Sequence, residues 1–228
     1  MVNVSPNSEL PVTVLYKGCV LALVACLAGC VIEPATQALL DAYRLNRTGA
    51  AAGLNPDFSY LRVQVDEREV FLALGYVEQH PDGPVEVWFS ANAEVLRLYD
   101  GRVVGAVTKT GPGWLSVSFK NLPSWDKLGN EAVFDRARDL SPGYRYGIRE
   151  KMLIRRIAPP DNSQLKLVQA SSLTWFEERV QGDEHEPPAR YAVSLDGITP
   201  RVVYAEQCLS GDLCFSWQRW TSLDKGAP

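Results

Sequence analysis

From residue 60 onward, apolar and polar residues alternate in short runs, and this period of two is typical of β-strands with one buried face. Turn-forming residues separate the runs. The runs occupy residues 60–65, 69–78, 85–90, 94–99, 102–107, 114–119, 144–157, 164–168, 173–180, 190–195, 201–207 and 214–220. The pattern predicts a mainly β chain, an antiparallel meander of about 10–12 strands that forms a barrel-like or sandwich sheet.

The clearest local signal is the dipeptide Asp100-Gly101, which lies between two apolar runs and predicts a tight hairpin. Residues 121–143 are less regular than the rest of the chain. Within them, residues 131–137 predict a short helix or a turn region. Residues 181–188 are polar and proline-containing, and they predict a loop.

The N-terminal segment has the pattern of a bacterial lipoprotein leader. Lys17 ends a mostly uncharged stretch, and the apolar run that follows is too short to span a bilayer as a helix. A lipobox then supplies two small residues that fit the signal peptidase and a thiol that accepts diacylglycerol. It consists of Leu27, Ala28, Gly29 and Cys30. We predict that residues 1–29 are a signal peptide and that Cys30 is the lipid-modified N-terminus of the mature chain.

Two alternatives for this segment stay open. Residues 23–26 also fit the lipobox pattern, although cleavage there would halve the apolar run. The segment could also be an uncleaved anchor, or an ordinary signal peptide with a chance cysteine. Position 31 is Val rather than Asp, so the inner-membrane retention signal familiar from enteric bacteria is absent. We therefore expect a protein anchored to the outer membrane and facing the periplasm.

Behind the leader, residues 36–47 predict a short helix, because Thr36 can cap it and Leu39, Leu40 and Tyr43 share one face. No linker divides the remaining chain. We expect residues 30–56 to form a lipid-anchored segment with this helix and residues 57–228 to form a single β domain.

The charge balance restricts the partners. The formal net charge is −4, and no long Lys/Arg run occurs, which argues against nucleic-acid binding. It argues equally against a purely electrostatic attachment to anionic lipid, so membrane attachment should depend on the acyl anchor. The oligomeric state is not specified by any feature of the sequence.

Cysteine usage agrees with export. Cys19 and Cys26 would leave with the leader, and Cys30 would carry lipid. The remaining pair, Cys208 and Cys214, predicts a disulfide across a hairpin in an oxidising compartment, with two reduced thiols as the alternative.

Candidate catalytic chemistry is sparse. His80 and His185 both lie in turn-like segments, and no Gly-x-Ser-x-Gly elbow accompanies them. Carboxylates such as Glu177 and Glu178 could in principle form a glycosidase pair, but acids at strand ends more often face water. We expect no catalytic residues, no metal and no cofactor.

Aromatic and basic side chains are better candidates for binding a glycan. Sugar faces stack on exposed aromatic rings, although a β-barrel core also consumes large aromatics. Arginines along a strand could contact an acidic polysaccharide or simply protect a strand edge. The candidate glycan contacts are Trp88, Trp114, Arg155 and Arg156.

Several stretches of the chain resemble one known family. They are the lipobox, residues 87–91 and 95–98, the segment from Asp100 to Val104, and residues 189–197. These stretches, in the order in which they occur, resemble the YjbF-like, or GfcB-like, lipoprotein family of group 4 capsule and exopolysaccharide operons. Ala192 departs from the family pattern, which usually has Trp there, and the Cys208–Cys214 hairpin continues beyond the usual ending.

The resemblance implies an antiparallel β fold, an outer-membrane lipoprotein, and a role in making or exporting a capsule or exopolysaccharide. It brings no enzymatic residues with it. We therefore expect a non-enzymatic lipoprotein that assists polysaccharide assembly or export by binding glycan or a protein of the export machinery. A lipid-anchored polysaccharide-modifying enzyme and a structural envelope subunit stay open as alternatives.

Overall fold

The computed structural model describes residues 54–108, 111–183 and 185–220. The predicted leader, lipobox, lipidated Cys30 and helix over residues 36–47 all lie outside the described residues, so those predictions stay predictions.

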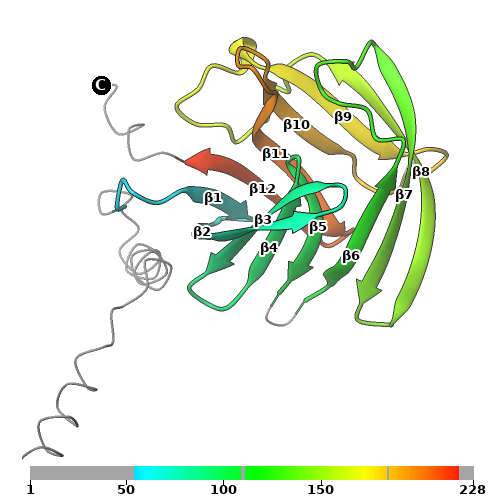
Figure 1. Ribbon diagram of the computed structural model, residues 1–228, viewed down its shortest axis with the longest axis horizontal. Coiled ribbons are helices and arrows are strands. Elements are labelled where there is room, and N and C mark those ends of the chain that lie inside the picture. The colour runs from blue at the N-terminus through cyan, green and yellow to red at the C-terminus, as the bar shows by residue number, and fades with distance from the viewer. Residues whose placement is uncertain (1–53, 109–110, 184, 221–228) are drawn as a thin grey trace, which may run out of the picture. The chain divides into compact units, whose positions relative to one another are not determined.

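Twelve strands form a closed antiparallel barrel in which each strand pairs with the next along the chain and β12 pairs with β1 (Figure 1). This confirms the mainly β fold class. The strands are β1 (Tyr60–Val65), β2 (Arg68–His80), β3 (Gly83–Ser90), β4 (Val95–Tyr99), β5 (Arg102–Val107), β6 (Gly113–Lys120), β7 (Glu131–Ser141), β8 (Arg145–Ile157), β9 (Thr174–Val180), β10 (Ala189–Ser194), β11 (Arg201–Ser210) and β12 (Leu213–Trp220). A 3-10 turn, η2 (Ala170–Ser172), lies in the β8–β9 connection.

The Asp100-Gly101 hairpin is confirmed. Both residues have positive φ, 48° and 79°, as a tight two-residue turn between β4 and β5 requires. A Cβ on Gly101 would also lie 2.4 Å from the Val202 side chain. Glycine is therefore needed here both for the backbone conformation and for the space.

The interior of the barrel is filled by alternate residues of the strands, which is why the period of two in the sequence is so regular. Trp88, Trp114 and Trp217 all belong to this core. Trp125 joins them from the β6–β7 connection, and its ring lies 5.2 Å from that of Phe176. The core is thus rich in tryptophan, and one of these side chains comes from a loop.

Two segments differ from the sequence prediction. Residues 131–137 belong to strand β7 rather than to a helix or turn. Residues 164–168 are not a strand but part of the β8–β9 connection, which packs on the outside of the barrel. There the Gln164 amide donates to the Tyr204 hydroxyl (2.9 Å), and the Lys166 backbone exchanges two hydrogen bonds with the Gln218 side chain (2.9 and 2.7 Å). Leu165 packs against the outer cluster of Trp175, Ala192 and Tyr204 while Leu167 is 58% exposed, so the apolar alternation arises here without strand pairing.

The two ends of the barrel differ. The described chain enters at Leu54 and leaves at Trp220, and these residues pack in one cluster at one end, which we call the termini end. The opposite end carries the β1–β2, β3–β4, β5–β6, β7–β8, β9–β10 and β11–β12 connections, and we call it the mouth. No helix within residues 54–108, 111–183 or 185–220 is long and apolar enough to cross a membrane.

Candidate functional site at the mouth of the barrel

An apolar cavity of about 420 Å³ opens at the mouth. This volume lies within the range of roughly 300–1,000 Å³ that is typical of ligand pockets. The cavity is lined by Val63, Val65, Arg68, Val70, Leu72, Asn92, Glu94, Val95, Leu96, Ala106, Val107, Thr108, Gly111, Leu209, Leu213 and Phe215. It is therefore formed by β1, β2, β4, β5, β11 and β12, with residues of the β3–β4 and β5–β6 connections at its rim.

The wall of the cavity can be followed along β2. Arg68 lies at the rim and Val70 and Leu72 lie below it at every second position, a span of about 13 Å at the usual rise of a strand. Beyond the lining, the next inward-facing residue of β12 after Phe215 is Trp217, and the next of β2 after Leu72 is Leu74, the strand partner of Trp88. Both tryptophans are almost fully buried in the packed core. The cavity is therefore closed below by core residues.

The rim is polar. Glu94 accepts a hydrogen bond from the Ser90 hydroxyl (3.0 Å), and Thr108 accepts one from the Gly111 amide (3.1 Å). Arg68 is exposed, and in the described part of the chain no hydrogen bond or ion pair engages its guanidinium. The rim therefore offers one free positive charge to a ligand.

Beside the cavity, the other half of the mouth is closed by charges. Arg136 and Arg138 of β7 point into the barrel and are almost completely buried. Glu150 of β8 accepts hydrogen bonds from both arginines, and Glu186 of the β9–β10 connection accepts one from each, at 3.2 and 2.7 Å. We call these four residues the mouth cluster.

The charges of the mouth cluster compensate for burial. Burial alone would lower the pKa of Arg138, but Glu186 and Glu150 outweigh it and raise that pKa above its usual value. Arg138 therefore stays charged inside the barrel. Because Glu186 lies in a loop, its contacts fasten that loop across this half of the mouth.

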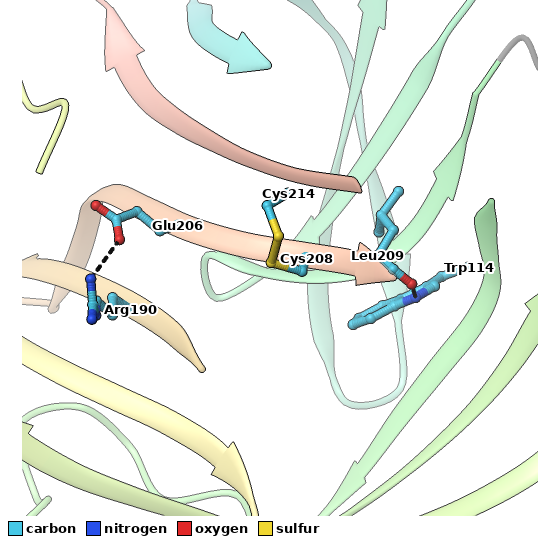
Figure 2. The surroundings of a disulfide bond; sticks show 6 residues. All are labelled: Trp114, Arg190, Glu206, Cys208, Leu209 and Cys214. Carbon is cyan, nitrogen blue, oxygen red and sulfur yellow. Dashed lines mark hydrogen bonds and ion pairs between the residues drawn. A yellow bond between two sulfur atoms is a disulfide. The ribbon is translucent and has the colours of Figure 1, made fainter. Parts of the chain in front are cut away.

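Trp114 separates the two halves of the mouth. It is the strand partner of Ala106, and its indole Nε1 donates to the Leu209 carbonyl (2.9 Å), as Figure 2 shows. The guanidinium carbons of Arg136 and Arg138 lie 5.4 and 5.1 Å from the centre of its ring. One tryptophan thus adjoins both the apolar lining and the charged cluster.

The disulfide predicted from the sequence is confirmed. Cys208 and Cys214 are strand partners at the end of the β11–β12 hairpin and are bonded to each other, directly beside Leu209 in the cavity wall (Figure 2). The bond ties together the two strands that carry Leu209, Leu213 and Phe215. It therefore fixes one wall of the cavity.

A second charged group lies deeper, near the termini end. Arg102 is fully buried, donates to Glu178 (2.8 Å), and lies 3.8 Å from the centre of the Trp125 ring. The Gln207 side chain accepts hydrogen bonds from the Val103 amide and the Tyr191 hydroxyl. Burial and the nearby Glu178 raise the pKa of Tyr191 well above its usual value, so its hydroxyl stays protonated and donates. Arg102 Nη1 also donates to Asp100 (3.2 Å), whereas its buried Nη2 has no hydrogen-bond partner among the described residues.

The structure places the predicted glycan contacts apart from one another. Trp88 and Trp114 are 1% and 4% exposed, so a glycan could reach these rings only by entering the barrel. Arg155 and Arg156 are exposed on β8, where Arg155 donates to Glu177 (2.9 Å). Of the four, Trp114 adjoins the mouth and Arg155 lies on the outer face, whereas the guanidinium of Arg156 lies 6.0 Å from the centre of the core Phe176 ring, near the termini end of β8.

The acids considered as a catalytic pair are also separated. Glu177 and Glu178 are neighbours on β9 and so point to opposite faces: Glu177 pairs outside with Arg155, and Glu178 pairs inside with Arg102. Within the described residues, no group of three or more His, Cys, Asp or Glu side chains is placed to hold a metal ion.

The residues that sequence reasoning missed are Arg68 and the mouth cluster. Arg68 follows a turn and looks like an ordinary solvated residue. The sequence signal for the cluster is the spacing of Arg136 and Arg138, which lie two residues apart and therefore share one face of β7. Apolar Phe134 and Leu140 flank them on the same face.

Fold and site together define a twelve-stranded antiparallel barrel that has an apolar, closed-bottomed pocket at one end. No family model and no curated protein matches the chain. The fold is similar to the crystal structure of the hypothetical lipoprotein YmcC from Escherichia coli, with a TM-score of 0.51 and 14% identity over 97% of this chain and 100% of that chain. At this identity the similarity shows a shared fold. The resemblance to the YjbF-like family stays a prediction.

Proposed function

We propose that this chain is a lipid-anchored, non-enzymatic protein of the bacterial envelope that binds a ligand in its mouth cavity and assists the assembly or export of a surface polysaccharide. The observation that carries the proposal is the apolar cavity itself, because a soluble barrel core is normally filled by side chains. The lipobox ending in Cys30 supports the anchor, and the solved neighbour with this fold is itself described as a lipoprotein. The resemblance to capsule-operon lipoproteins supports the pathway.

The place of the cavity is consistent with this role. The described chain begins at the termini end, so an anchor that precedes residue 54 would join the barrel there, and the mouth lies at the other end. Under the proposal, a barrel tethered to the outer membrane can offer its mouth to a partner in the periplasm without moving its anchor. The partner would be the ligand itself or a protein of the export machinery that delivers it.

The test is a deletion of the gene in the native host under polysaccharide-producing conditions, followed by complementation. We expect surface polysaccharide to fall in the deletion strain and to return with the wild-type gene but not with Cys30→Ala, which removes the acyl anchor. Intact-mass analysis of the purified protein reports the anchor independently. Unchanged polysaccharide in the deletion strain contradicts the pathway, and a mature protein without fatty acyl chains contradicts the anchor.

A further inference from the structure

We propose that the mouth cavity binds a single aliphatic chain that carries an anionic head, with the chain inside the barrel and the head beside Arg68. This inference rests on the proposed ligand-binding role of the mouth and names the class of ligand. Fatty acids, lysophospholipids and polyisoprenyl phosphates share this chemistry, and the experiment below distinguishes them.

The side chains in the cavity wall favour a hydrocarbon chain as the ligand. Below the rim, every side chain that faces the cavity is aliphatic except for one phenyl ring. These side chains are Val63, Val65, Val70, Leu72, Leu96, Ala106, Leu209, Leu213 and Phe215. None of them can donate or accept a hydrogen bond, so sugar hydroxyls or peptide groups would lose their hydrogen bonds to water without replacement. A hydrocarbon chain has none to lose, and it gains from every methylene it removes from water.

The shape of the cavity favours a ligand with one hydrocarbon chain, inserted with its polar head toward the mouth. The pocket extends about 13 Å along β2, and the packed core that follows the lining, Trp88 and Trp217 included, closes it below. A ligand can therefore enter only from the mouth, and its polar head has to stay at the rim. The volume of about 420 Å³ suits one chain of this length better than the two chains of a phospholipid.

The positive charge of Arg68 at the rim favours an anionic head group on the ligand. Arg68 is exposed beside the cavity and unengaged by any described residue, whereas the mouth-cluster arginines are each held by two glutamates. A carboxylate or phosphate head would give Arg68 a partner while the chain lies against Val70 and Leu72 below it. Glu94, which also lies at the rim, is held by the Ser90 hydroxyl and disfavours a second negative charge on its own side.

The test measures binding to the full chain carrying Cys30→Ser, so that no attached acyl group competes. Dodecanoate with a terminal bromine is the probe, because bromine quenches tryptophan fluorescence at short range and Trp88 and Trp217 lie in the packed core just beyond the lining. We expect saturable quenching that unlabelled dodecanoate reverses. Lysophospholipid, farnesyl phosphate and a two-chain phospholipid are then compared as competitors, and the strongest competitor identifies the natural source.

Three variants assign the site. Val70→Trp fills the cavity at mid-depth and should weaken binding more than tenfold, whereas Val133→Trp, on the exposed face of β7, should not change it. Arg68→Glu should weaken dodecanoate binding about threefold to tenfold and leave dodecanol unaffected. Arg145→Glu, an exposed arginine of β8, is its control. Should Val70→Trp fail to fold, Val70→Gln places a polar group in the wall and should weaken binding as well.

The proposal is overturned if dodecanoate does not quench, or if quenching is equal in wild type, Val70→Trp and Val70→Gln. The result is separable from the proposed function. Loss of polysaccharide in the deletion strain without chain binding keeps the function and rejects this ligand. Chain binding with unchanged polysaccharide keeps this ligand and rejects the pathway.

Discussion

Glu150 is the residue whose removal tests the electrostatics of the mouth most directly. Its side chain is 10% exposed, and it accepts hydrogen bonds from Arg136 Nε (2.7 Å) and Arg138 Nε (3.1 Å), whose side chains are each 9% exposed. Glu150→Gln removes one negative charge from between two buried positive charges. The glutamine keeps the shape and one carbonyl acceptor, but its NH2 group replaces the other oxygen, so one of the two arginines loses its acceptor together with the negative charge.

The expected loss follows from this burial. Removing one partner of a buried ion pair destabilises a protein by about 3–5 kcal/mol, and the retained carbonyl places Glu150→Gln at the lower end, about 3 kcal/mol. Glu186 contacts the same arginines but is 27% exposed, so water replaces part of what Glu186→Gln removes. We expect about 1 kcal/mol for that variant.

The assay is equilibrium unfolding in urea, followed by tryptophan fluorescence. With a slope of about 2–3 kcal/mol per molar urea, Glu150→Gln should move the midpoint down by about 1–1.5 M, and Glu186→Gln by less than about 0.5 M. The double variant should lose less than the sum of the two, because both acids neutralise the same arginines. A loss below about 1 kcal/mol for Glu150→Gln, or a larger loss for Glu186→Gln, would refute the reasoning.

Three further predictions concern stability. Replacing both Cys208 and Cys214 by Ser should lower the free energy of unfolding by about 2 kcal/mol, because the bridge closes a short loop; reductant should destabilise the wild type equally and leave the variant unchanged. Gly101→Ala should cost about 1–3 kcal/mol through its positive φ and its contact with Val202, and Val202→Ala should restore only the steric part. Burial by itself would raise the pKa of Glu177, but arginine hydrogen bonds outweigh it and lower that pKa below its usual 4.5. The stabilisation that ionised Glu177 contributes is therefore present above about pH 4.5 and is lost as the pH falls through the folded-state pKa. In Glu177→Gln, the melting temperature should depend less on pH than in the wild type, and only on the acid side of about pH 4.5.

The strands that could be predicted from the sequence are those whose inward residues are apolar. In β4, Leu96 and Leu98 face the core and Arg97 lies between them, and the Asp100-Gly101 turn that follows has few alternative conformations. The disulfide could be predicted for a similar reason, since two cysteines flanking a short turn are brought together by any hairpin. In both cases the information is local.

β7 could not be predicted because its inward face is half polar. Arg136 and Arg138 break the apolar alternation between Phe134 and Leu140, and a sequence window has no means of counting them as buried. What allows their burial is Glu150, on the next strand, and Glu186, some 50 residues along the chain. The pattern of β7 becomes meaningful only after the barrel has closed.

The cavity could not be predicted for a stronger reason. Its wall joins β1 and β2 to β11 and β12, which become neighbours only when β12 pairs with β1. No short motif describes it, because each strand contributes one or two ordinary aliphatic residues. Trp88 and Trp114, predicted as candidate glycan contacts, are instead buried core residues next to the cavity.

The number of strands links the cavity to the anchor. An up-and-down barrel with an even number of strands must begin and end at the same end, so β1 begins and β12 ends at the termini end. At the termini end, Trp125 enters the core from the β6–β7 connection, while Leu54 and Trp220 pack together on the outer face of the barrel. At the mouth the connections are short apart from the β9–β10 loop, which Glu186 fastens over the charged half. The apolar half has no such cover among the described residues, and this asymmetry is what makes it the place where a ligand can enter.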